Sequence, residues 1–203
     1  MSRLTLACVA ALLLPAPASA QRLAHSGKLA ARPAPYAMDT TGRFEAAIAR
    51  VGDDIFIGGQ PTERGLREMK ARGVTTVVNL RTPEEMRRTV PFDEPARVAK
   101  LGMTYVYLPV RGTADYPYSP EIVTKFADAL QKSNGKVLLH CTIAWRASHL
   151  WAAYLIRERG IPVDEALANA RAINLMDTHR MGENGKQPVE EFLGRTLPSL
   201  GRP

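Results

Sequence analysis

Cys141 and Arg146 are the two residues of this chain whose types and spacing suggest covalent chemistry. The thiol follows an apolar run, residues 137–139, and His140; the guanidinium comes five positions after the thiol. A thiolate is a strong nucleophile, and a guanidinium holds oxyanions through a planar fork of hydrogen-bond donors. If both groups lie on one tight loop, the thiolate could attack an oxyanion that the guanidinium holds.

The first twenty residues predict an export signal. Arg3 precedes an apolar run, residues 4–14, and the small residues Ala18 to Ala20 form a cleavage site. The run is shorter than a membrane-spanning helix needs to be. We therefore expect cleavage after Ala20 and a periplasmic or secreted mature protein without a stable membrane anchor.

Cleavage would leave Cys141 as the only cysteine of the mature chain, because Cys8 lies in the signal. An internal disulfide would then be excluded. A free thiol in an oxidising compartment is open to oxidation unless its reactivity is used. Composition alone leaves a second interpretation, a buried and inert cysteine.

Length and charge bound the remaining possibilities. Residues 21–42 are rich in Ala, Pro and basic residues and predict a flexible leader, and residues 43–203 are the length of one domain. The net charge of +7 is spread along the chain, and aromatic residues make up 6%. Without a basic run interleaved with aromatics, we expect no nucleic-acid partner. The oligomeric state is not predicted.

The order of expected elements places the cysteine in an α/β domain. Apolar β-rich runs predict strands at residues 55–57, 74–80, 104–110 and 137–140, and amphipathic patterns predict helices at residues 62–72, 95–101, 119–134, 146–160, 163–172 and 189–197. Alternation of this kind favours a mainly parallel central sheet flanked by helices.

Cys141 then lies where a parallel strand gives way to a helix. Ligands of such sheets bind at the carboxyl ends of the strands, and the first amides of a helix attract anions. These amides and Arg146 would favour the thiolate over the thiol. Arg81 and Arg111 also follow strands at their carboxyl ends, so either could extend an anion site.

Three upstream segments support a resemblance to a known family. His140-Cys141 followed by a short loop and Arg146 resembles the phosphate-binding loop of cysteine-dependent tyrosine and dual-specificity phosphatases. Residues 56–61, 77–81 and 108–110 resemble the bacterial branch related to the beta-lactamase-hydrolase-like domain, with similarity over about residues 55–175. The resemblance implies a phosphatase-like, three-layer α/β fold.

The resemblance also implies roles for particular residues. Cys141 would attack phosphorus, Arg146 and loop residues Thr142, Ile143, Ala144 and Trp145 would hold the phosphate oxygens, and His140 and Ser148 would support the thiolate. Asp115, the only acidic residue of the loop at 111–120, is the candidate general acid; an ordinary turn aspartate is its alternative. The substrate would be a phosphorylated protein or small molecule, with no metal or organic cofactor.

The loop also departs from the phosphatase pattern. Only four residues separate Cys141 from Arg146, where the phosphatase loop has five; four is the spacing of rhodanese-like sulfurtransferases, which carry a persulfide. Ala144 and Trp145 stand where a glycine is usual, and a Cβ penalises positive φ. Trp145 could wall the pocket or fill the core. Sulfur transfer and noncatalytic anion binding therefore stay open as alternatives.

Overall fold

The computed structural model describes residues 36–38, 41–173 and 185–200. The predicted export signal and most of the predicted leader lie outside these residues. Within the described ranges, no helix is both long enough and apolar enough to cross a membrane.

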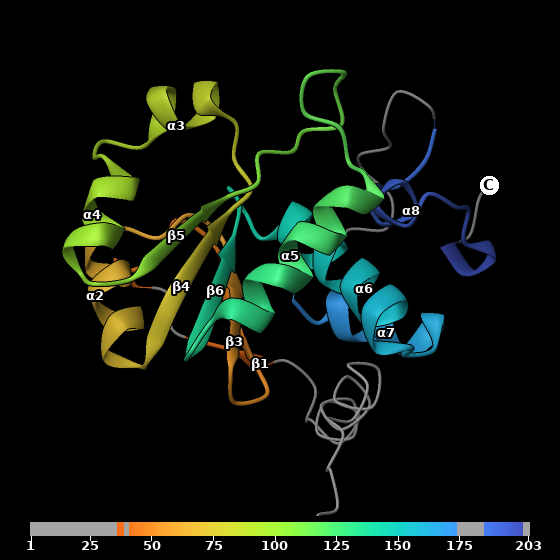
Figure 1. Cartoon of the computed structure of the whole chain (residues 1–203), viewed down its shortest axis with the longest axis horizontal. Helices are drawn as coiled ribbons and strands as arrows, with labels where there is room; N and C mark the ends of the chain where they lie inside the picture. The colour runs from red at the N-terminus through yellow and green to blue at the C-terminus, as the bar shows by residue number, and fades with distance from the viewer. Residues whose placement is uncertain (1–35, 39–40, 174–184, 201–203) are drawn as a thin grey trace, which may run out of the picture. The chain divides into compact units, whose positions relative to one another are not determined.

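A six-stranded sheet forms the centre of the domain (Figure 1). Its strands lie in the order β1-β2-β3-β6-β4-β5, and the last four are parallel to one another. Their bounds are β1 (Tyr36–Ala37), β2 (Ile48–Val51), β3 (Ile55–Gly58), β4 (Val74–Asn79), β5 (Thr104–Tyr107) and β6 (Lys136–His140). The predicted, mainly parallel α/β architecture is confirmed.

Helices cover both faces of this sheet (Figure 1). α2 (Glu63–Ala71) and α4 (Glu94–Lys100) pack on one face through an apolar core that includes Leu66, Met69 and Val98. On the other face, α5 (Pro120–Lys132) and α6 (Trp145–Arg159) contact the strands, and α7 (Val163–Arg171) and α8 (Pro188–Leu193) pack against α6. The result is the expected three-layer domain, with α6 buried along most of its length.

Some elements differ from the sequence prediction. Tyr36 and Ala37, which lie in the predicted leader, pair with β2. The predicted strand at residues 104–110 is shorter in the structure and ends at Tyr107, although the amides of Leu108 and Val110 still donate to the carbonyls of Asn79 and Leu80. The predicted helix at residues 189–197 is also shorter, because α8 ends at Leu193 and the next residue, Gly194, adopts φ +65° and closes the helix.

Helix α3 (Pro83–Thr89) was not predicted at all. None of its residues is buried, so it has no apolar stripe for periodicity to detect. Its signal is a capping box: the Thr82 hydroxyl accepts from the Glu85 amide, and the Glu85 carboxylate accepts from the Thr82 amide. This helix follows β4 and carries the carboxylate that matters most for the site.

Candidate active site

Strand register brings Cys141 to the carboxyl edge of the sheet. His140, the last residue of β6, is paired with Gly58 of β3 on one side and Asn79 of β4 on the other. Cys141 follows, with its amide donating to the carbonyl of Gly58 at 3.2 Å. The thiol is 1% exposed, and α6 begins four residues later at Trp145. The predicted strand-to-helix position of Cys141 is therefore observed.

The short loop needs one left-handed residue. Ala144, the N-cap of α6, has φ +69° and ψ −11°, and no side chain caps this helix end. A residue with a Cβ costs about 1–2 kcal/mol in this region relative to the right-handed one. The positive φ anticipated from the missing glycine is thus present. The first turn of α6, next to the cysteine loop, therefore has no side-chain cap.

The turn after β3 contacts the loop between Cys141 and Arg146 through backbone groups. Gly59 pairs with Ile143 in an antiparallel bridge, and the amide of Gln60 donates to the carbonyl of Thr142 at 3.1 Å. A Cβ added to Gly59 would lie 2.8 Å from that carbonyl oxygen. The glycine is needed for this close approach of the two backbone segments.

Arg146 lies in the second position of α6 and is 7% exposed. Its Nη1 donates to Glu85 Oε2 (2.9 Å) and to the carbonyls of Val110 (2.7 Å) and Leu80 (3.3 Å). Its Nη2 donates to Glu85 Oε1 (2.9 Å) and to Thr142 Oγ1 (3.1 Å). The guanidinium is therefore fixed beside the cysteine loop by a bidentate carboxylate and the ends of two strands.

Glu85 forms ion pairs with two arginines. Its Oε1 lies 3.3 Å from Nη1 of Arg111, whose side chain is 53% exposed, as well as 2.9 Å from Nη2 of Arg146. The sequence-predicted pair Arg111 and Arg146 thus share one carboxylate oxygen. One carboxylate thus faces two guanidinium groups at this edge of the sheet.

The charges of this group stabilise one another. Burial alone would raise the pKa of Glu85, but the hydrogen bonds and charge of Arg146 outweigh it and hold that pKa below its ordinary value. For Arg146, burial alone would lower the pKa, yet the negative charges of Cys141 and Glu85 leave it raised. Arg146 and Glu85 therefore each favour the charged form of the other.

On the other side of the loop, His140 is held by a buried carboxylate. Nε2 of His140 lies 2.8 Å from Oε1 of Glu94, and both side chains are 0% exposed. Oε2 of Glu94 accepts from Nε2 of Gln60 at 2.7 Å. Burial would raise the pKa of Glu94, but His140, followed by Gln60, keeps it low.

Arg81 follows the carboxyl end of β4, as predicted. It is 1% exposed, and its Nη nitrogens donate to groups of the protein. Its Nη1 donates to Oε1 of Gln60 at 2.7 Å, and its Nη2 donates to Thr89 Oγ1 and to the carbonyl of Glu85. Arg81 thus fastens α3 to the edge of the sheet.

Two further predicted residues face the core. The hydroxyl of Ser148 donates to the carbonyl of Ala144 at 2.9 Å, so it is used within the first turn of α6 rather than on the thiolate. Trp145 is 6% exposed and packs edge-on against His149, with ring centroids 4.8 Å apart. Burial lowers the pKa of His149 to about 3, so it stays neutral. Of the two interpretations of Trp145, the structure favours core.

Asp115 is exposed in a turn closed by bonds from the amides of Arg111 and Gly112 to the carbonyl of Tyr116. Within the part of the chain that the structure describes, its carboxylate makes no hydrogen bond or ion pair, to Cys141 or to any other residue. The structure thus brings together Cys141, Arg146 and their partners, but does not bring Asp115 to them.

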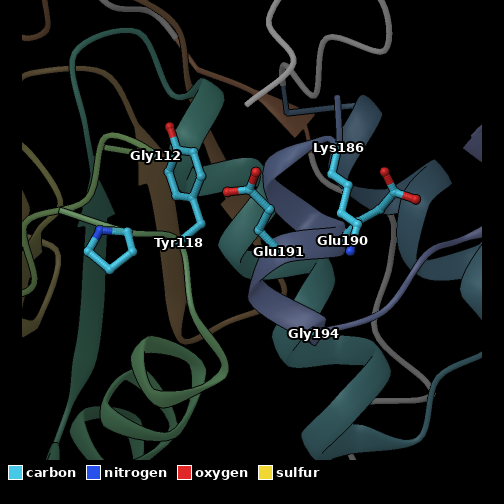
Figure 2. A pocket seen from close by; sticks show the side chains of 7 residues that line it. Gly112, Tyr118, Lys186, Glu190, Glu191 and Gly194 are labelled. Carbon is cyan, nitrogen blue, oxygen red and sulfur yellow. The ribbon is translucent and has the colours of Figure 1, made fainter. Parts of the chain in front are cut away.

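A cleft of about 390 Å³ lies beyond this turn, between the segment before α5 and the end of the chain around α8 (Figure 2). The phenol of Tyr118 stands opposite the carboxylate of Glu191 across it. Its lining residues are Gly112, Pro117, Tyr118, Lys186, Glu190, Glu191 and Gly194. Cys141 and Arg146 are not among them, so the cleft adjoins the site rather than containing it. Within the described ranges, no cluster of three or more His, Cys, Asp or Glu side chains could hold a metal ion.

Sequence reasoning missed Glu85, Glu94 and Gln60. Glu85 was detectable, since Thr-x-x-Glu after a strand is a capping-box signature. Gln60 was noticed only as part of a turn. Glu94 carries no local signal, because an acidic residue at the start of a helix is ordinary and its burial depends on strands far away in the sequence.

Comparisons with known proteins agree with this geometry. A beta-lactamase hydrolase-like protein of Xylella fastidiosa (strain Temecula1) is 28% identical over 131 residues, which cover 63% of this chain and 30% of the relative. The chain thus matches less than a third of that curated relative's length. A DUF442 protein from Shewanella putrefaciens CN-32 is 28% identical, covering 64% of this chain and 79% of its own, with a TM-score of 0.50. TpbA of P. aeruginosa shares the fold at 17% identity, covering 82% and 93% of the two chains, with a TM-score of 0.56.

The family comparison confirms the resemblance inferred from the cysteine loop. Residues 39–187 match the family described as DSP-PTPase phosphatase fused to NAD+ kinase. The fold and the curated relatives point to the same dual-specificity-like group, including its beta-lactamase hydrolase-like branch. Because the match spans most of the chain, this protein belongs to the dual-specificity-type phosphatase family.

Proposed function

We propose that this protein hydrolyses a phosphate monoester through a phosphocysteine (thiophosphate ester) intermediate on Cys141. The observation that carries the proposal is the clamp: Arg146, beside the cysteine loop, is held in a bidentate grip by Glu85. The family assignment supports phosphate as the oxyanion. Export after cleavage at Ala20 is part of the same proposal.

The chemistry requires two displacements. The Cys141 thiolate attacks phosphorus, so an S–P bond forms as the P–O bond to the leaving group breaks, and Asp115 gives its proton to the leaving oxygen. Water then attacks phosphorus and returns a proton to Asp115. The S–P bond breaks, which releases inorganic phosphate and restores the thiolate. Asp115 must reach the site from its exposed turn for both steps.

The donors of Arg146 indicate how phosphate would bind. Both hydrogens of Nη2 are used, one on Glu85 and one on Thr142 Oγ1, and Nη1 faces three acceptors. Nε–H is the remaining donor. A two-point contact with phosphate would use Nε and Nη2, so the hydroxyl of Thr142 would give way to a substrate oxygen.

The direct test offers the purified protein an aryl phosphate and, separately, thiosulfate with cyanide, each beside a Cys141→Ser variant. We expect phosphate release that disappears in the variant, and trapping of phosphate on the Cys141 peptide by acid quench and mass spectrometry. Thiocyanate formation would replace the proposal by persulfide-based sulfur transfer, which the four-residue loop spacing favours. Silence in both assays would leave an anion-binding module.

Arg111 is the residue we expect to influence substrate choice. Its half-exposed guanidinium contacts the same carboxylate oxygen as Arg146, so it can meet a second negative charge near the phosphate. Arg111→Gln should lower kcat/KM for an acidic phosphopeptide about fivefold more than for an uncharged aryl phosphate. Arg88→Gln, an exposed change on α3, is the control. Equal losses on both substrates would contradict this role.

A further inference from the structure

Gln60 is the residue at which the contacts of the site meet. Its backbone amide donates to the carbonyl of Thr142 (3.1 Å), the residue after the cysteine. Its side-chain Nε2 donates to Glu94 Oε2, and its Oε1 accepts from Arg81 Nη1, each at 2.7 Å. The side chain is 0% exposed. Gln60 thus contacts the cysteine loop, the carboxylate of Glu94 and the guanidinium of Arg81.

From Gln60 the contacts run in two directions. Through Glu94 they reach His140, which directly precedes Cys141. Through Arg81 they reach the backbone of Glu85, whose carboxylate grips Arg146. Arg146 in turn donates to the hydroxyl of Thr142, the residue to which the Gln60 amide donates. The contacts thus return to Gln60 through the cysteine loop and form a closed ring, with Glu94 and His140 as a branch.

An amide suits this junction for a chemical reason. The ionised carboxylate of Glu94 can only accept hydrogen bonds, and the guanidinium of Arg81 can only donate them. A glutamine offers a donor and an acceptor on the same neutral group, so it joins the two without adding charge. Its orientation is set by the groups it faces.

We propose that Gln60 is a positioning residue for phosphoryl transfer. Its side-chain amide fixes the position of His140, through Glu94, relative to the position of Arg146, through Arg81 and Glu85. The inference rests on the proposed phosphatase function, but Gln60 does not touch the substrate and acts through Glu94 and Arg81.

Two substitutions separate positioning from simple space filling. Gln60→Glu keeps the size but places a second carboxyl group against Glu94, so the pair holds a shared proton in acid and loses it as the pH rises. While protonated, the new group can still donate to Glu94 and accept from Arg81. Gln60→Met fills the space but makes neither bond at any pH. Charged or titratable groups near this junction come from several elements. They are Glu94 from α4, His140 from β6, Arg81 after β4, Glu85 from α3, Arg146 from α6, Tyr105 from β5 and Glu45 before β2.

The measurement is kcat/KM on an aryl phosphate, divided by the wild-type value at each pH from about 5 to about 8. For Gln60→Glu, we expect a ratio near one in acid that falls about tenfold or more as the pH rises, reversibly on one sample. For Gln60→Met, we expect a similar loss at every pH. Gln131→Glu, the same change on the exposed surface of α5, should give a flat ratio near one.

A flat ratio for Gln60→Glu, or wild-type activity in Gln60→Met, would overturn the inference. So would activity lost only in step with native tryptophan fluorescence, because that is what a purely structural role predicts. If the wild type hydrolyses no aryl phosphate, the proposed function fails by itself. The alkylation rate of Cys141 by iodoacetamide, read on its own peptide by mass spectrometry, would then show the same pH-dependent difference if Gln60 positions the loop.

Discussion

Arg146→Lys is expected to lower kcat/KM for an aryl phosphate by about 10³-fold, although the positive charge is kept. Lysine has a single nitrogen, so it cannot grip Glu85 at both oxygens and still present a donor to phosphate. It would also leave the carbonyls of Val110 and Leu80 without a donor that they now share. The loss should therefore fall on kcat as well as on KM, since the fork is needed for charge that develops in the transition state.

The measurement is steady-state kinetics beside single-turnover phosphorylation of Cys141, which separates chemistry from later hydrolysis. Arg67→Lys, on the exposed side of α2, is the matched control and should change neither parameter by more than about twofold. A lysine variant that retains a tenth of the wild-type kcat/KM would show that positive charge alone is enough. In that case the bidentate geometry seen with Glu85 would have no catalytic meaning.

The position of the nucleophile could be predicted from the sequence, but the groups that hold the clamp could not. An apolar strand followed by His-Cys and a helix start is a local pattern, so Cys141 and Arg146 were placed at the correct edge of the sheet. The partner of Arg146, Glu85, comes from α3, and the partner of His140, Glu94, comes from α4. Both helices reach the site only after β4 and β6 pair. No local sequence pattern predicts that these helices contact the site.

Arg81 and Asp115 show why position on a strand end is a weak guide to a side chain's role. Both were chosen for lying just after strands or in the loop before β6. Arg81 is buried, with Nη1 and Nη2 donating to Gln60, Thr89 and the carbonyl of Glu85, while Asp115 lies on an exposed turn. Whether a polar group faces the core or solvent depends on partners far apart in the chain, and these are set only by the complete fold.

Glu94→Gln should cost about 3 kcal/mol in the free energy of unfolding at pH 7. The carboxylate is 0% exposed and receives donors on both oxygens, from His140 at 2.8 Å and from Gln60 at 2.7 Å. An amide keeps only one accepting oxygen, so one of the two donors would face another N–H in a buried setting. Arg81 would also lose one nearby negative charge, although Glu85 and Glu45 act on it more strongly.

This cost should depend on pH in a defined direction. Because the pKa of Glu94 is held below its ordinary value of 4.5 in the folded state, its contribution is fully present above that value and is lost as the pH falls through the lower, folded-state value. The gap between wild type and Glu94→Gln should thus be widest near neutrality and narrow steadily below about pH 4.5. Urea unfolding followed by the fluorescence of Trp145 and Trp151, both buried in α6, measures it. Glu121→Gln, on the exposed start of α5, should show no comparable gap. A gap that stays constant across this range would mean that the buried carboxylate stabilises the fold through its shape and packing, with its charge contributing nothing.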